Sequence, residues 1–190
     1  MQKGKIIFLN GVRASGKTTT ARTLQERLDA PFYLINFDAF INMTPIKYFT
    51  DEKYFKDSTE SRKVANKAVS MLPHTIKSFS DMGNNTIIEH ILLNVDTLME
   101  ECVKILHEYP VLFVHVICPT EELRRREEER GGQVGYAEGQ LSYLTPENTY
   151  DITVDTFANP TEECADKIIE ILNYPEKFTA FKTLWEQLTK

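Results

Sequence analysis

Residues 9–21 read LNGVRASGKTTTA, where Gly11, four further residues and Gly16-Lys17-Thr18 fit the phosphate-loop pattern without a gap. The glycines let the backbone curl so that successive amide hydrogens face one anion, and the helix expected to follow adds the positive end of its dipole. Lys17 would reach the β- and γ-phosphates of a nucleotide, and the Thr18 hydroxyl would bind Mg²⁺. We therefore predict a nucleotide site at this loop. Its predicted residues are Gly11, Val12, Arg13, Ala14, Ser15, Gly16, Lys17, Thr18 and Thr19.

Composition and charge limit what else the chain can be. Its 190 residues, 42% apolar and 26% charged, are typical of one globular domain. A net charge of −6 argues against non-specific binding to nucleic acid, which needs a basic face. Cys102, Cys118 and Cys164 are odd in number and far apart, which indicates buried thiols in a reducing compartment. With no secretory signature and no apolar window near the ~20 residues of a membrane span, we expect a cytoplasmic protein.

Short apolar runs alternate with longer amphipathic ones along the chain. The expected strands are 5–10, 32–37, 86–88, 111–118 and 151–154, and the expected helices are 18–28, 60–79, 95–107 and 162–172. Strands that alternate with helices of this length predict a parallel sheet covered on both faces. We therefore predict an α/β fold like that of P-loop nucleoside-triphosphate hydrolases, with a five-stranded parallel sheet flanked by helices, over residues 1–173.

Two segments stand outside that alternation. An insertion over 40–83 begins with aromatic and charged residues, and Pro73 should kink or break its helix. Residues 174–190 contain an amphipathic helix whose apolar stripe either packs on its own domain, which we expect, or forms the face of a homodimer.

Acidic residues end two of the expected strands. Asp38 follows the second strand at the sheet edge that also carries the phosphate loop, where a carboxylate can accept the proton of a hydroxyl that attacks the γ-phosphate. Capping of the next helix is the other role open to Asp38. Glu89 ends the third strand and could hold Mg²⁺ directly or through water. His90 beside it is either a structural histidine or a substrate contact.

Residues 121–130 read EELRRREEER. A solvated helix with ion pairs four residues apart, such as Glu121 with Arg125 and Arg124 with Glu128, accounts for most of these charges. Arg126 and Arg130 are like charges on one face, and glycines follow them at 131, 132 and 135. We therefore predict a lid over 124–140 whose two arginines close on the phosphates and take part in catalysis.

These strings together resemble the chloramphenicol phosphotransferase-like family of P-loop kinases. The resemblance spans about residues 5–172. It rests on GVRASGKT, on FDAF with Met43-Thr44-Pro45, on IIEHILL, on Arg126-Glu127 and Arg130-Gly131, on Gln140, and on YDITVDT at 150–156. It implies that Asp38 is the catalytic base. The chain departs from the family at Gly132 and Gln133, usually aspartate and arginine, at Thr145, usually histidine, and at Glu89, where aspartate is expected.

We therefore predict an ATP-dependent kinase that moves the γ-phosphate of ATP-Mg²⁺ to a hydroxyl group of a small molecule. Its expected catalytic residues are Asp38, Lys17, Arg126 and Arg130, and its expected metal ligands are Thr18 and Glu89. Five aromatic residues of the insertion could line an acceptor pocket: Phe40, Tyr48, Phe49, Tyr54 and Phe55. Two alternatives stay open, a nucleotide-binding switch that acts on a protein partner and a nucleoside or RNA-end kinase.

Overall fold

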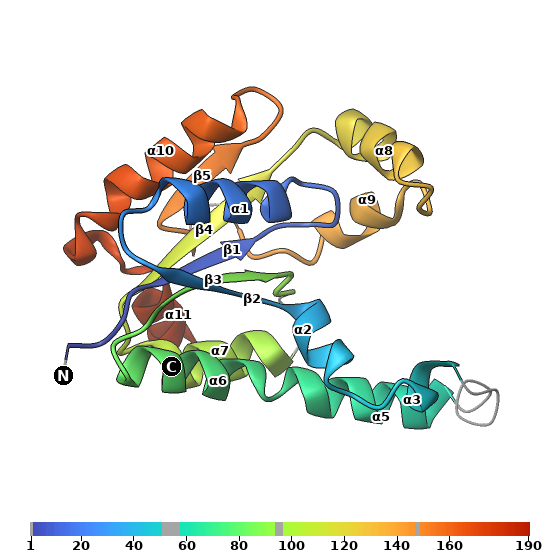
Figure 1. The fold of residues 1–190 in the computed structure, drawn as a ribbon, viewed down its shortest axis with the longest axis horizontal. Helices are drawn as coiled ribbons and strands as arrows, with labels where there is room; N and C mark the ends of the chain where they lie inside the picture. The colour runs from blue at the N-terminus through green and yellow to red at the C-terminus, as the bar shows by residue number, and fades with distance from the viewer. Residues whose placement is uncertain (1, 51–57, 94–96, 147–148) are drawn as a thin grey trace.

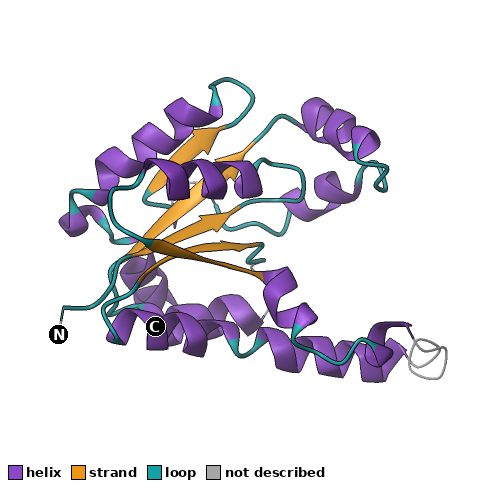
Figure 2. Ribbon diagram, viewed as in Figure 1, coloured by secondary structure: helices purple, strands orange, loops and turns teal. Residues whose placement is uncertain are grey.

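A five-stranded parallel sheet forms the centre of the computed structural model, which describes residues 2–50, 58–93, 97–146 and 149–190 (Figures 1 and 2). The strands are β1 (Ile6–Asn10), β2 (Phe32–Asn36), β3 (Asn85–His90), β4 (Val111–Ile117) and β5 (Ile152–Asp155). They lie in the order β2-β3-β1-β4-β5, and every pair is parallel. This confirms the predicted α/β fold, and the strand boundaries differ from the expected ones by at most two residues.

Strand β1 lies at the centre of the sheet, and all five of its residues are buried. Its neighbours are β3 and β4, so that Asn10 pairs in register with His90 on one side and His115 on the other. Because the strands are parallel, their carboxyl ends meet at one edge of the sheet. The segments that follow β1, β2 and β3 therefore leave the sheet beside one another.

Helices cover both faces of the sheet (Figure 1). On one face, α1 (Lys17–Arg27) and α10 (Thr161–Leu172) pack over Ile7 and Leu9 of β1. On the other, α6 (Leu72–Asp81), α7 (Thr97–Leu106) and α11 (Ala180–Leu188) pack over Ile6 and Phe8. Alternate residues of one buried strand thus contribute to two separate cores, as expected for a sheet covered on both sides.

Most of the described part of the insertion is helical. It contains α2 (Phe37–Asn42), α3 (Lys47–Thr50) and α5 (Ser58–Val69), and it continues into α6. The single helix expected over 60–79 is interrupted between α5 and α6, and Pro73 lies in the first turn of α6. This confirms the predicted break, because proline lacks an amide hydrogen and is tolerated only in the first turn of a helix.

The segment between β4 and β5 contains α8 (Thr120–Glu129) and α9 (Tyr136–Leu141). The carboxylate of Glu127 is buried between them and accepts hydrogen bonds from the Gly135 and Ala137 amides, both at 2.8 Å. Gly131 and Gly135 have positive φ angles of 63° and 86°, which favour glycine. The glycine-rich turn is therefore fastened to α8 by a buried acidic side chain.

The chain ends with a short 3₁₀ helix, η2 (Pro175–Lys177), followed by α11. The Phe181 ring lies 5.1 Å from that of Phe113 and 6.0 Å from that of Phe8, measured between centroids. The carboxylate of Asp151 accepts hydrogen bonds from the Thr179 and Ala180 amides at 2.8 and 2.9 Å. The apolar stripe of α11 therefore faces its own sheet.

Two further sequence expectations bear on the described residues. Cys102, Cys118 and Cys164 are free, buried thiols, as expected. Among the helices in the described ranges, none is both long enough and apolar enough to cross a membrane.

Candidate functional site

The phosphate loop leaves β1 at Asn10 and enters α1 at Lys17. Two of its glycines stand where a side chain would collide. A Cβ atom on Gly11 would lie 2.3 Å from the Val116 carbonyl oxygen, and one on Gly16 would lie 3.0 Å from the side chain of Thr156. Gly16 also has a φ of 97°. The loop is therefore packed against β4 and the segment that follows β5, and only glycine fits at these two positions.

The ammonium group of Lys17 lies inside the curl of the loop. It donates hydrogen bonds to the carbonyl oxygens of Gly11 and Val12, both at 2.9 Å. Burial lowers the pKa of Lys17 to about 8; the Glu89 carboxylate opposes this shift, and the Arg130 guanidinium adds to it. The loop thus holds a buried cation whose present partners are neutral carbonyls, and an anion could replace them.

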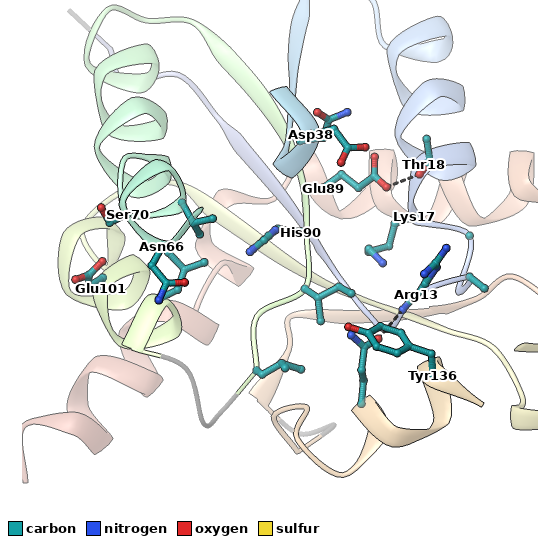
Figure 3. A pocket seen from close by; sticks show the side chains of 18 of the residues that line it. Arg13, Lys17, Thr18, Asp38, Asn66, Ser70, Glu89, His90, Glu101 and Tyr136 are labelled. Atoms are coloured by element: carbon teal, nitrogen blue, oxygen red, sulfur yellow. Dashed lines mark hydrogen bonds between the residues drawn. The ribbon is translucent and has the colours of Figure 1, made fainter. Parts of the chain in front are cut away.

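Thr18 and Glu89 come together although 71 positions separate them, since the Thr18 hydroxyl donates a hydrogen bond to the Glu89 carboxylate (Figure 3). In the described residues no group of three or more His, Cys, Asp and Glu side chains could hold a metal ion. Mg²⁺ does not need such a group, because it is usually bound by one or two protein oxygens together with phosphate oxygens and water. The two oxygen donors found here fit that ion.

A cavity of about 1100 Å³ opens beside the loop (Figure 3). Its walls are the phosphate loop with Lys17 and Thr18, the ends of β2 and β3, and α5 with α7 on the far side. Asp38, Glu89 and Arg130 line it as well. Of the four predicted catalytic residues, Arg126 is the one that does not line this cavity.

Asp38 lies in the first turn of α2, is exposed, and faces the cavity next to Glu89 (Figure 3). The other role open to Asp38, capping of this helix, is filled by Asn36, whose side-chain oxygen accepts a hydrogen bond from the Ala39 amide at 3.0 Å. Within the described ranges no hydrogen bond to the Asp38 carboxylate is present. Its carboxylate is thus available to a ligand in the cavity.

His90 follows Glu89 on β3 and lines the same cavity. Burial, with the Lys17 ammonium nearby, lowers the pKa of His90 to about 4. The imidazole is therefore neutral at physiological pH and contributes no charge to the cavity.

The arginine run of α8 is divided between two tasks. Arg126 is largely buried and donates hydrogen bonds to the Ala14 carbonyl at 3.3 Å and to the Thr156 hydroxyl and carbonyl at 3.0 and 3.1 Å. Arg130 faces the large cavity instead. Arg126 thereby connects α8 to the outside of the phosphate loop and to the segment after β5.

Ion pairs four residues apart are present on this helix, as expected, but the two named examples are wrong. Arg125 pairs with Glu122 and Glu129, Arg126 pairs with Glu122, and Arg124 reaches across to Glu138 of α9 at 2.6 Å. The i to i+4 rule considers one isolated helix, whereas α9 packs against α8 here and offers Arg124 a partner from another element.

Two of the five aromatic residues that were expected to line an acceptor pocket lie elsewhere. Phe40 is buried in the core beneath the sheet, and Tyr48 does not line the cavity. The side chain of Phe49, together with Tyr54 and Phe55, lies outside the described residues. The far wall is formed by side chains that the sequence analysis missed: Asn66 of α5, Ser70 directly after α5, Leu98 and Glu101 of α7, and Ile91 and Leu93 after β3. The spacing of Asn66 and Ser70, four residues apart on one predicted helix, was the sequence signal that could have indicated this wall.

Comparison with known proteins assigns this chain to a family. Residues 4–173 match the family model described as chloramphenicol phosphotransferase-like protein. An adenylyl-sulfate kinase of Clostridium acetobutylicum is 30% identical over 182 residues, which cover 90% of this chain and 84% of the relative.

Two solved structures share the fold. The APS kinase of Mycobacterium tuberculosis, in complex with AMPPNP and APS, superposes with a TM-score of 0.65 at 17% identity, covering 91% of this chain and 99% of that one. An unliganded sugar kinase from Janibacter sp. HTCC2649 superposes with a TM-score of 0.63 at 24% identity, covering 92% and 98%.

The family match covers almost the whole chain, including the loop that encloses Lys17 and the carboxylates that line the cavity. The chain belongs to the chloramphenicol phosphotransferase-like family of P-loop kinases, and it is an ATP-dependent phosphotransferase.

Proposed function

We propose that the enzyme transfers the γ-phosphate of ATP to a hydroxyl group of a small molecule bound in the large cavity. One observation carries the proposal. The phosphate loop with Lys17 lines the same cavity of about 1100 Å³ as the Asp38 carboxylate, which makes no hydrogen bond within the described residues. The donor phosphates would lie at the loop. The acceptor would lie against the wall formed by α5, α7 and the segment after β3.

In this reaction Asp38 acts as the general base. The acceptor oxygen forms a bond to the γ-phosphorus, the bond from that phosphorus to the β,γ-bridging oxygen breaks, and the hydroxyl proton passes to the Asp38 carboxylate. The exposure of Asp38 toward the cavity and the cap supplied by Asn36 support this assignment.

Lys17 would exchange its carbonyl partners for β- and γ-phosphate oxygens and so offset their negative charge. Thr18 and Glu89 would hold Mg²⁺, which supplies further charge neutralisation when bound. The two side chains already contact each other, so no change in the fold is needed to bring them to one ion.

The far wall indicates the character of the acceptor. It combines polar side chains, Asn66, Ser70 and Glu101, with apolar ones, Ile91, Leu93 and Leu98. Such a wall fits a molecule that carries both hydrogen-bonding groups and an apolar part. Residues 40–83 thus serve as the acceptor-binding insertion and 124–140 as the lid over a kinase domain of residues 1–173.

A screen of ATP consumption tests the proposal. The panel contains chloramphenicol, sugars, nucleosides and adenylyl sulfate, the last because of the 30% identical adenylyl-sulfate kinase, and it also contains RNA and candidate protein partners. We expect a small hydroxyl compound to stimulate turnover above the background hydrolysis. Stimulation by RNA or by protein alone would contradict the proposal and favour one of the alternative functions.

Replacement of Asp38 by asparagine tests the general base. Asp38→Asn keeps the shape of the side chain but removes the proton acceptor, so kcat with the identified acceptor should fall by roughly 10²–10⁴. The Kd for ATP should stay within about threefold of the parent value, because the carboxylate serves the acceptor. The matched control is Asp29→Asn, an exposed position far from the cavity. A kcat of Asp38→Asn close to that of the parent would remove Asp38 from the mechanism.

The lowered pKa of Lys17 predicts that nucleotide binding depends on pH. In the free enzyme Lys17 loses its proton as the pH rises through about 8, and bound phosphates favour the protonated form and raise this pKa. Binding should therefore take up close to one proton at about pH 9 and almost none at about pH 6.5, and affinity should fall by up to about tenfold per pH unit above pH 8.

Calorimetry with a non-hydrolysable ATP analogue, in buffers of different ionisation enthalpy, measures this uptake. Lys17→Arg is the control, because arginine stays protonated over the whole range. Equal proton uptake by the parent and by Lys17→Arg would show that another group titrates.

The two arginines of the predicted lid should respond differently to substitution. Arg126→Ala leaves the carbonyls of Ala14 and Thr156 without their donor, so it should lower the free energy of unfolding by about 1–3 kcal/mol and weaken nucleotide binding. Arg130→Ala removes a side chain that faces the cavity, so it should leave stability unchanged and slow transfer. Urea unfolding without nucleotide, followed by kcat, separates the two. Loss of stability in Arg130→Ala, or none in Arg126→Ala, would contradict this division.

A further inference from the structure

Arg13 is the third residue of the phosphate loop, and its side chain lines the large cavity together with Lys17 and Arg130. Figure 3 shows it between Lys17 and Tyr136. The phosphate-loop pattern assigns a role only to the backbone at this position, so the guanidinium is not explained by nucleotide binding through the loop amides.

Helix α9 holds Arg13 from the lid side. The Arg13 amide donates a hydrogen bond to the side-chain oxygen of Gln140 at 3.1 Å, and the guanidinium carbon lies 5.9 Å from the centre of the Tyr136 ring. Both partners belong to α9, whose first turn is fastened by the buried Glu127 carboxylate. Contacts with α9 thus set the position of Arg13.

Gly132 lies beside the guanidinium. A Cβ atom at that position would lie 3.4 Å from Arg13 Nη2, an ordinary van der Waals distance. The turn between α8 and α9 therefore lies next to the Arg13 side chain.

The guanidinium has donors to spare. In the described part of the chain it makes no hydrogen bond and no ion pair, whereas that of Arg126 is fully engaged. It shares the cavity with the cations Lys17, Lys67 and Arg130 and with three carboxylates, of which that of Glu89 is already bonded to Thr18. Arg130 lies close enough to Lys17 to affect its pKa. Cations around one cavity favour the binding of a polyanion.

The cavity that Arg13 lines indicates which part of the nucleotide it would meet. Arg13 lines the cavity that contains Asp38, the proposed base, and it does not line a smaller cavity of about 250 Å³ formed in part by Arg126, Arg130 and Thr156. We therefore expect its guanidinium at the reacting end of the triphosphate.

We propose that Arg13 is a catalytic residue whose guanidinium binds the γ-phosphate of ATP and stabilises the charge that develops on it during transfer. The planar fork of arginine matches two phosphate oxygens at once. This proposal rests on the proposed function for the place of the acceptor, but the contact with the γ-phosphate can be measured without one.

The test compares ATP with ADP, which lacks the γ-phosphate. Calorimetry measures the Kd of ADP and of a non-hydrolysable ATP analogue, both with Mg²⁺, for the parent, Arg13→Ala and Arg13→Lys. We expect Arg13→Ala to weaken the analogue about tenfold or more and ADP by less than about twofold, as for loss of a charge-assisted hydrogen bond. Arg13→Lys should fall between, because it keeps the charge and loses the fork.

Arg22→Ala is the matched control, an exposed arginine on α1 that does not line the cavity, and it should change neither Kd. Thermal unfolding of each variant checks that the loop still folds. Equal weakening of ADP and analogue by Arg13→Ala would assign Arg13 a structural role in the loop and overturn the proposal. Parental affinity for both ligands would also overturn it, and would leave the proposed function standing. A parent protein that binds neither nucleotide would overturn the proposed function itself.

Discussion

The tight enclosure of the phosphate loop is the constraint on which the rest of the site depends. Gly11 lies against the Val116 carbonyl so closely that no side chain fits, and the Thr156 hydroxyl donates a hydrogen bond to the Ser15 carbonyl at 2.7 Å. Arg126 bonds the Ala14 carbonyl from the same side. The curl of the loop is thus fixed from outside by β4, by the segment after β5 and by α8, which leaves its inner face to Lys17.

A buried asparagine connects this loop to the far wall of the cavity. Asn10 accepts a hydrogen bond from the Leu92 amide at 2.7 Å and donates one to the Leu92 carbonyl at 3.1 Å, and it also donates to the Tyr150 hydroxyl at 2.9 Å. Leu92 lies between Ile91 and Leu93, which line the cavity. Because Asn10 directly precedes Gly11, one fully buried side-chain amide links the phosphate loop to this wall.

Local patterns predicted the fold well, and they predicted the site only where its residues follow a strand or belong to the loop. The strands were correct because burial on both faces produces continuous apolar runs, and the helix break at Pro73 was correct because its cause is local. The partner of Arg124 and the place of Phe40 were missed because tertiary packing decides them. The cap at Asn36 and the pairs of Arg125 are local, and they were missed because several neighbouring side chains could make the same contact. Thr145 illustrates this limit of local patterns. Its hydroxyl, in the segment that follows α9, donates a hydrogen bond to the Tyr150 hydroxyl, and no local pattern predicts that contact.

The charge distribution explains why the arginines around the loop have separate tasks. The Arg126 guanidinium donates hydrogen bonds to the Ala14 carbonyl, the Thr156 hydroxyl and the Glu122 carboxylate, so it orders the loop whether or not a nucleotide is bound. The guanidinium groups of Arg13 and Arg130 line the cavity instead, together with Lys17, Asp38 and Glu89. Repulsion among these cations is offset when a polyanion binds, which favours a highly charged ligand. Under the proposed function that ligand is the triphosphate, and the cations would lie around its γ-phosphate rather than around the acceptor.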